Sequence, residues 1–286
     1  MAAIVPVAVA GRRRPHLAGW SAVPEGHTIH RIARDQNADL AGHRIAASAV
    51  QARFAAGAAR LDGHVFEQAE AWGKHLFQWW EDLPDVLHVH LGLIGKWTRR
   101  TSPPPAPVGE VRLRLEGPTH TWDLSGPMAC ALITPDERDQ VIAGLGPDPL
   151  RPDADPERFA ARVGSSRRAI GALLMDQDVI AGIGNVYRAE LLNIVGIDPR
   201  REGRALTRDE VERLWAESVR QLRLGVRRNK IVTMRTDELA RPVSRLRPGE
   251  GRYVYHQEAC GRCGTPVVDR RIGGRRISSC PTCQPA

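Results

Sequence analysis

The sequence predicts an α+β protein with two domains: an N-terminal β-sandwich led by a helix, and a C-terminal helical domain that ends in a four-cysteine hairpin. Three observations predict this fold class. Eight short β-like runs at close spacing follow one helical stretch, which is typical of a sandwich or barrel. Beyond Gly144, apolar residues recur at helical spacing instead. Two Cys-x2-Cys pairs lie near the end of the chain, in a segment too short and polar for a core of its own.

The composition limits the classes of protein to which the chain can belong. Its 286 residues are enough for two domains with cores. The net charge of +8 indicates either a polyanionic partner or simply a solvated basic surface. The chain has no run of about 18 apolar residues, so we expect no membrane span. Its apolar start precedes the Arg12–Arg14 cluster, the reverse of the order in a secretory signal, and we expect a cytoplasmic protein.

The first predicted domain spans residues 24–146. Residues 1–23 show no sustained periodicity and are interpreted as a separate N-terminal extension. From Thr28, apolar residues recur at helical spacing up to Leu40, and Gly42 ends this helix. The predicted strands that follow are Arg44–Val50, His64–Ala69, Lys74–Trp80, Val86–Leu91, Gly95–Arg99, Val111–Leu115, His120–Leu124 and Ala129–Ile133.

The second predicted domain spans residues 147–250 and follows a break rich in glycine and proline at residues 144–149. Its helical periodicity fails between Arg235 and Gly251. The last predicted module, residues 251–286, holds four cysteines. The predicted helices are Pro156–Val163, Ala169–Met175, Val186–Val195 and Arg208–Leu224.

The last module has the ligand spacing of a structural zinc site. Two thiolate pairs, each closing a tight turn, can surround one tetrahedral Zn²⁺ and leave no position for water, so we expect a structural ion and not a catalytic one. Between the pairs, Val267–Ile272 and Arg275–Ser279 predict a hairpin whose arginines suit phosphate contacts. Cys130, in a β-like run, is interpreted as an inert core thiol. The predicted zinc ligands are Cys260, Cys263, Cys280 and Cys283.

Two shorter motifs each allow a structural and a functional interpretation. Pro24-Glu25 precedes the first helix, and proline suits a first helical turn. As an N-terminus, Pro24 would carry a secondary amine able to attack an aldehydic sugar carbon, whereas inside a chain its nitrogen is a tertiary amide without a proton. The glycine turn before Asn185 either starts a helix, with Asn185 as N-cap or phosphate donor, or offers exposed amides to a phosphate.

In this order along the chain, the motifs resemble the formamidopyrimidine-DNA glycosylase and endonuclease VIII family of base-excision repair enzymes. The resemblance rests on Pro-Glu-Gly at residues 24–26, on Gly-Ile-Gly-Asn-Val-Tyr-Arg at residues 182–188, and on a hairpin with an arginine five residues before its third cysteine. It covers residues 24–283. Further matches lie at residues 72–76, 90–95, 145–150 and 174–177.

The resemblance implies an active site built around Pro24. As an N-terminal amine, Pro24 would attack the anomeric carbon of a damaged nucleotide, and Glu25 would be the general acid that helps to open the sugar ring. Lys74, on a β-hairpin turn, would complete the active site; its structural alternative is a solvated strand lysine. An unperturbed α-amine has a pKa of roughly 7.7–8.0, which leaves a minor neutral fraction for attack. The resulting iminium would lead to strand cleavage by β- and then δ-elimination.

The resemblance also implies how the chain holds damaged double-stranded DNA. Asn185, from a helix–two-turn–helix element, and Arg275, from the zinc hairpin, would hold the phosphates that flank the lesion, and Arg275 is counted with the catalytic residues. Leu93 falls where the family inserts an apolar wedge into the gap left by the flipped base. We expect a monomer, associated with the nucleoid.

Two departures favour the endonuclease VIII branch, whose substrates are mainly oxidised pyrimidines. The chain starts its motif with Pro-Glu-Gly-His instead of Pro-Glu-Gly-Pro, and residues 123–128 lack the Arg–Phe pair of the other branch. Two alternatives stay open. One is the same enzyme with a preference for oxidised purines such as 8-oxoguanine, and the other is a zinc-dependent protein that binds damaged DNA without chemistry because Pro24 lies inside the chain.

The position of Pro24 leads to a hypothesis about the residues before it. A proline nucleophile must be terminal, so we expect residues 1–23 to be absent from the active enzyme. Val23 could mark the true start of the protein, since a GTG start codon is read as valine in a conceptual translation but begins synthesis with methionine. Methionine before proline is readily removed. Met1–Ala22 would then be upstream sequence that was wrongly joined to the gene.

Overall fold

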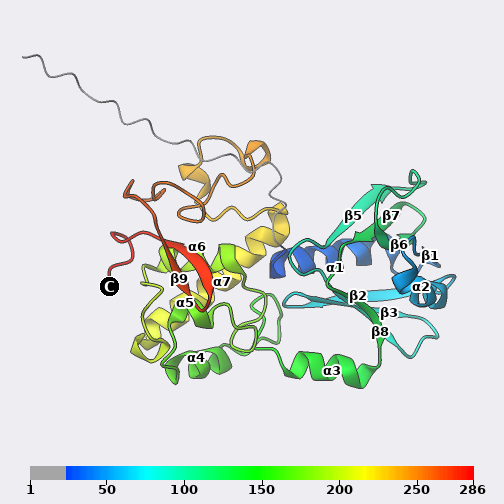
Figure 1. The fold of residues 1–286 in the computed structure, drawn as a ribbon, viewed down its shortest axis with the longest axis horizontal. Coiled ribbons are helices and arrows are strands. Elements are labelled where there is room, and N and C mark those ends of the chain that lie inside the picture. The colour runs from blue at the N-terminus through cyan, green and yellow to red at the C-terminus, as the bar shows by residue number, and fades with distance from the viewer. Residues whose placement is uncertain (1–23) are drawn as a thin grey trace, which may run out of the picture.

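The computed structural model describes residues 24–286, and the predicted extension, residues 1–23, lies outside the described part (Figure 1). Helix α1 (Gly26–Leu40) comes first, and Glu25 is its N-cap residue. Pro24 therefore lies one residue before the cap and not in the first helical turn. The helix begins two residues before the predicted Thr28, at Gly26, whose amide donates to the Gly182 carbonyl at 2.8 Å.

The expected β-sandwich is confirmed. Two four-stranded sheets have the strand orders β1-β6-β7-β5 and β2-β3-β4-β8, and all their paired neighbours are antiparallel. Each predicted strand overlaps an observed one. The strands are β1 (Ala46–Ser48), β2 (Phe66–Trp72), β3 (His75–Trp80), β4 (Val86–His90), β5 (Lys96–Thr101), β6 (Val111–Glu116), β7 (His120–Ser125) and β8 (Ala129–Ile133).

One hydrophobic core fills the sandwich. It includes Ile29 and Leu40 of α1 and large strand residues such as Phe66, Trp80 and Trp122, each at most 3% exposed. Helix α1 packs along β2 and so belongs to this core. Cys130 packs against the same core, and burial raises its pKa to about 12, which agrees with an inert thiol.

Two helices of the first half were not predicted. A 3-10 turn, η1 (Ala52–Phe54), leads into α2 (Ala55–Leu61), and α3 (Pro135–Ala143) follows the last strand of the sandwich. Helix α3 has no buried residue, so no apolar periodicity marks it. A capping box between Thr134 and Glu137 and a proline at its start define it instead.

The second half is helical, as predicted. Its helices pack around a second hydrophobic core, which is separate from that of the sandwich. Helix α5 is shorter than predicted, and the aperiodic segment after α7 contains only two 3-10 turns, η3 (Thr236–Glu238) and η4 (Val243–Arg245). Among residues 24–286, no helix combines the length and apolar character that a bilayer crossing requires. The helices are α4 (Pro156–Gly164), α5 (Ile170–Leu173), α6 (Asn185–Val195) and α7 (Arg208–Arg228), with a 3-10 turn η2 (Gly203–Ala205).

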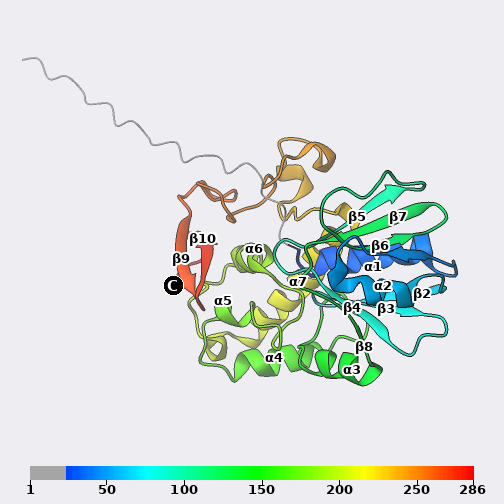
Figure 2. The same cartoon turned by 45° about the vertical axis from the view of Figure 1, so that its right-hand side comes forward.

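The C-terminal hairpin forms as expected from β9 (Val268–Ile272) and β10 (Arg275–Ser279), with Gly273 and Gly274 in left-handed conformations at its turn. The hairpin lies beside α6 (Figure 2). Ile277 and two of the cysteines are buried in the core of the helical half. The cysteine module therefore extends that core and has none of its own.

Candidate active site

Glu25 is fully buried and joins the two halves of the molecule. Its carboxylate accepts backbone N–H bonds from Gly184 at 2.8 Å, Val186 at 2.9 Å and Tyr187 at 3.4 Å. These are the first amides of α6, which have no partner within the helix. The expected N-cap role of Asn185 is wrong: the N-cap residue is Gly184, and Glu25 supplies the capping oxygens from the other half.

The glycine at position 184 is required by this close approach. A Cβ at Gly184 would lie 2.6 Å from Oε1 of Glu25. Any side chain there would displace the carboxylate, so Gly184 leaves the room that Glu25 occupies.

Lys74 lies on the turn between β2 and β3, as predicted. Its Nζ donates to the Ile183 carbonyl at 2.7 Å, in the same loop that Glu25 caps. Gly73 adopts the left-handed φ of +58° at this turn, and a Cβ on it would lie 2.9 Å from the Ala181 side chain. Glu25, Lys74 and the loop before α6 thus meet at one place.

The charges at this place alter both acid–base groups. Burial raises the pKa of Glu25, although the Lys74 ammonium and the three N–H donors oppose the shift. Burial lowers the pKa of Lys74, and Arg275 lowers it further, whereas Glu25 raises it. The site therefore contains a carboxyl that holds its proton to higher pH and an amine that releases its proton at lower pH than usual. Pro24, half-buried, directly precedes this carboxyl.

A buried arginine connects Asn185 to the cysteine hairpin. Arg188 donates to the Gly171 carbonyl at 3.0 Å, to the Arg276 carbonyl at 2.8 Å and to Oδ1 of Asn185. Burial, and the charge of Arg275 beside it, lower the pKa of Arg188 to about 10. Arg188 was only part of a motif in the sequence, yet it fixes the side chain of Asn185 relative to β10.

Arg275 begins β10 and lies exposed near this arginine. With Arg168 and Arg188 it lines a cavity of about 240 Å³ beside the hairpin turn. Its charge acts on both Lys74 and Arg188. The structure thus connects Asn185 to the strand that begins with Arg275, and it places the charge of Arg275 close enough to act on Lys74.

Leu93 lies in the turn between β4 and β5, with 65% of its surface exposed. Ile94 beside it is 78% exposed, and Met128 is 70% exposed. Gly92 brings this turn close to Met128, since a Cβ on Gly92 would lie 2.9 Å from the Met128 Cβ. Three large apolar side chains therefore project into solvent from two neighbouring turns of the sandwich.

A group of three histidines next to Lys74 was not predicted. His75 and His90 face each other across β3 and β4 with ring centroids 4.7 Å apart, and His75 Nδ1 lies 2.9 Å from His88 Nε2. Burial lowers the pKa of His75 to about 3 and that of His88 to about 4, so both rings are neutral at pH 7. The sequence feature that could have indicated this group is the spacing of His88 and His90, because residues two apart lie on one face of a strand.

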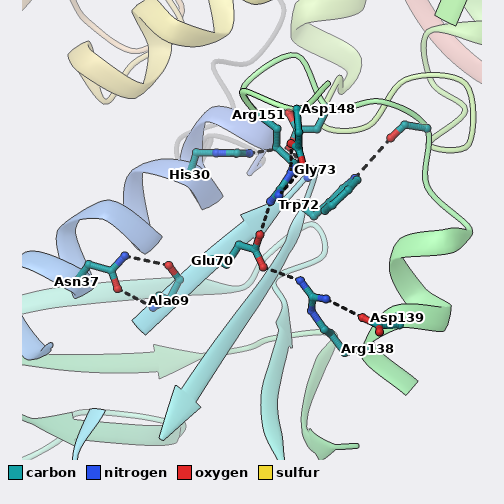
Figure 3. A network of polar contacts seen from close by, with 12 residues as sticks. His30, Asn37, Ala69, Glu70, Trp72, Gly73, Arg138, Asp139, Asp148 and Arg151 are labelled. Carbon is teal, nitrogen blue, oxygen red and sulfur yellow. Dashed lines mark hydrogen bonds and ion pairs between the residues drawn. The ribbon is translucent and has the colours of Figure 1, made fainter. Parts of the chain in front are cut away.

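The segment between the two halves is tied to the turn that carries Lys74. Asp148 accepts from His30 and from the Gly73 amide, both at 2.7 Å (Figure 3). Arg151 stacks on Trp72 with its guanidinium 4.1 Å from the ring centre. These contacts hold the turn that carries Lys74 against the segment between the two halves.

The four predicted cysteine ligands come together. Their sulfur atoms all lie within 4.8 Å of one another, with Cys260 and Cys283 at 3.9 Å and Cys263 and Cys280 at 3.5 Å. Zinc–sulfur bonds of about 2.3 Å in a tetrahedron place the sulfurs about 3.8 Å apart. The cluster therefore fits one zinc ion with a complete set of ligands.

Comparison with known proteins identifies the family. The profile of the formamidopyrimidine-DNA glycosylase N-terminal domain matches residues 23–125, and that of the formamidopyrimidine-DNA glycosylase H2TH domain matches residues 145–237. The chain is 44% identical over 268 residues to Endonuclease 8 1 of Mycobacterium tuberculosis, covering 92% of this chain and 100% of that protein. The chain belongs to the formamidopyrimidine-DNA glycosylase and endonuclease VIII family.

Other members of this family are similar at lower identity. The formamidopyrimidine-DNA glycosylase of Thermosynechococcus vestitus is 32% identical over 235 residues, which cover 79% of this chain and 81% of that one. The Lactococcus lactis enzyme in a complex with abasic-site DNA has a TM-score of 0.75 and 23% identity, covering 92% of this chain and 100% of that one. The fold and the family expected from the motifs are thus confirmed, and the chain is a member of a family of DNA-repair glycosylases.

Proposed function

We propose that the chain is a bifunctional DNA glycosylase and AP lyase of the endonuclease VIII type. The observation that carries the proposal is the burial of Glu25 under the first amides of α6, one residue after Pro24, with Lys74 bonded to the same loop. An amine at Pro24 would have a proton donor and a cation beside it. The 44% identity to Endonuclease 8 1 of Mycobacterium tuberculosis supports the branch.

The proposed reaction requires Pro24 to be N-terminal. Its secondary amine then bonds to the anomeric carbon, the bond from that carbon to the ring oxygen breaks, and Glu25 delivers a proton to this oxygen. The bonded nitrogen then loses its proton, and its freed electron pair forms an iminium as the damaged base departs with the electrons of its glycosidic bond and takes up a proton. Loss of a proton from the neighbouring carbon expels the 3′ phosphate, and a second elimination expels the 5′ phosphate. The raised pKa of Glu25 supports its role as the acid.

The contacts with DNA follow from the cationic side of the helical half. We assign Asn185 and Arg275 to the phosphates next to the lesion and Leu93 to the gap in the base stack, as its exposure allows. Solved complexes of the Lactococcus lactis enzyme contain abasic-site DNA and oxidised-pyrimidine DNA, which supports a DNA substrate. The four cysteines would hold Zn²⁺, which stabilises the hairpin that carries Arg275.

The preference for oxidised pyrimidines is supported by the turn between β7 and β8. Strand β7 ends at Ser125 and β8 begins at Ala129, and the residues between them, Gly126, Pro127 and Met128, include neither an arginine nor a phenylalanine. Excision of 5-hydroxyuracil should therefore exceed excision of 8-oxoguanine opposite cytosine. The reverse order would assign the chain to oxidised purines.

Borohydride trapping tests the chemistry. Protein that begins at Pro24 should form a covalent adduct with abasic-site DNA, and the full chain should bind this DNA without forming one. The adduct should persist in the Lys96→Ala variant, which removes an exposed lysine, and disappear when the proline amine is acetylated. A protein with a free Pro24 that binds but never traps DNA would support the alternative of a damage-binding protein without catalysis.

A further inference from the structure

A groove of about 710 Å³ opens where α1, α7 and the segment between the two halves meet. No residue assigned above to catalysis or phosphate binding lines it. Its apolar side chains come from three positions on α7 and one on the connecting segment, and its rim is basic. The lining residues are Leu150, Ala216, Val219 and Val226, with His30, Arg220, Arg223 and Arg227 at the rim.

The rim of this groove carries unneutralised positive charge. Arg220 pairs with Glu217 at 2.6 Å, whereas Arg223 and Arg227 form no ion pair with any residue of the described range 24–286. These two arginines are one helical turn apart on an exposed face, where like charges repel. An anionic group held between them would remove this repulsion.

The walls of the groove are held in place without an occupant. Arg31 of α1 donates to the Val226 carbonyl at 3.1 Å and to the Arg227 carbonyl at 3.3 Å, which fastens the end of α7 to α1. Gly225 lets α7 approach α1, since a Cβ there would lie 2.9 Å from the Cβ of His27 on α1. A preformed surface loses little conformational entropy on binding.

We infer that this groove docks a short acidic segment of a partner protein, with carboxylates on Arg223 and Arg227 and apolar side chains on Val219 and Val226. Residues 216–227 of α7 cover about 16 Å, which matches about three turns of an amphipathic helix. Duplex DNA fits this surface less well, because its backbone has phosphates for the rim but only the small C–H surface of its sugars for the floor. This docking goes beyond the proposed reaction and does not depend on it.

The test measures fluorescence polarisation of a labelled synthetic peptide with Glu and Leu at helical spacing, added to the full chain. Arg223→Glu/Arg227→Glu should weaken binding about tenfold or more, because two charge-assisted contacts are lost. The matched control, Arg208→Glu/Arg213→Glu, reverses two exposed charges on the same helix outside the groove and should leave binding nearly unchanged. A scrambled peptide of equal charge should bind weakly.

Three results would overturn the proposal. The first is equal weakening by the two double variants, or no binding to the unaltered chain. The second is equal affinity for the scrambled peptide, which would show a charge effect without a groove. The third is a loss of undamaged duplex DNA binding in the groove variant alone, which would make the groove a nucleic-acid surface. Circular dichroism of both variants confirms that each is folded.

Discussion

Two buried glutamates meet helix α6, and their surroundings differ. Glu25 accepts three backbone N–H bonds at the start of the helix, with the Lys74 ammonium beside it. Glu190, within the helix, accepts the consecutive amides of residues 253–255 at 2.7, 2.9 and 2.7 Å, and the hydroxyl of Thr233. Both carboxylates are fully buried. The same hydrogen-bond arrangement fastens a chain segment at Glu190, whereas in the proposed reaction it holds Glu25, the proposed acid, next to Pro24.

The largest effect is expected from Glu25→Gln. If Glu25 is the proton donor, the single-turnover rate of base release should fall by about 10²–10⁴-fold, since an amide cannot replace the acid. Glu190→Gln should leave this rate nearly unchanged in the folded protein. Rates are measured by rapid quench on 5-hydroxyuracil DNA. An equal loss of the single-turnover rate in both variants would show that the two carboxylates do not differ in their role in base release.

Removal of zinc should have the next largest effect. Without the ion, the hairpin and Arg275 lose their position, and DNA affinity should fall about 10–100-fold, the equivalent of one charge-assisted phosphate contact. The sandwich should stay folded, because its core contains no residue of the cysteine module. Chelation followed by DNA titration and tryptophan fluorescence checks both statements. Unchanged affinity after proven zinc loss would contradict the role of the hairpin.

A smaller loss, of stability, is expected from Glu190→Gln. The amide presents one NH₂ group to the amides of residues 253–255 and leaves buried donors unpaired, at a cost of about 1–3 kcal/mol. Urea denaturation followed by circular dichroism measures this change. The exposed Glu67→Gln variant serves as control and should lie within about 0.5 kcal/mol of the unaltered protein. An unchanged free energy of unfolding for Glu190→Gln would show that the hydrogen bonds of Glu190 contribute little to stability.

The smallest effect concerns pH. Because the pKa of Glu25 is raised above 4.5, the folded protein binds more protons than the unfolded chain between 4.5 and that raised value. The contribution of Glu25 to the free energy of unfolding therefore falls as pH rises through this window, by at most about 1.4 kcal/mol per pH unit. Glu25→Gln should make the slope of stability against pH more positive above pH 4.5. Identical slopes would show that Glu25 ionises normally.

Local patterns predicted much of the fold. The two cysteine pairs and the glycines between them determine a hairpin within a short segment, and the strands alternate over few residues, so both were found without the rest of the chain. Helix α3 was missed because its apolar residues lack periodicity, although the Thr134–Glu137 capping box was visible. In each case the information lies within one continuous segment of at most 24 residues.

The site was less predictable where its contacts span the chain. Asn185 was expected to be the N-cap of α6 or a phosphate donor, but the capping carboxylate comes from Glu25, 159 to 162 residues away from its partners. The histidine group depends on the register of β3 against β4, which places His75 opposite His90. Arg188 gains its role only because the β10 backbone passes beside α6. None of these pairings follows from spacing alone.

The glycines where the two halves meet constrain how the gene can evolve. At Gly26, Gly73 and Gly184 an added Cβ would lie within 3 Å of an atom of the opposite half. A recombinant gene that joins residues 24–146 of one family member to residues 147–286 of another would keep both cores. Its two halves would still fail to pack against each other if either parent carried a residue larger than glycine at one of these three positions. Evolution must therefore change the two halves in step where they meet, while their outer surfaces can diverge independently.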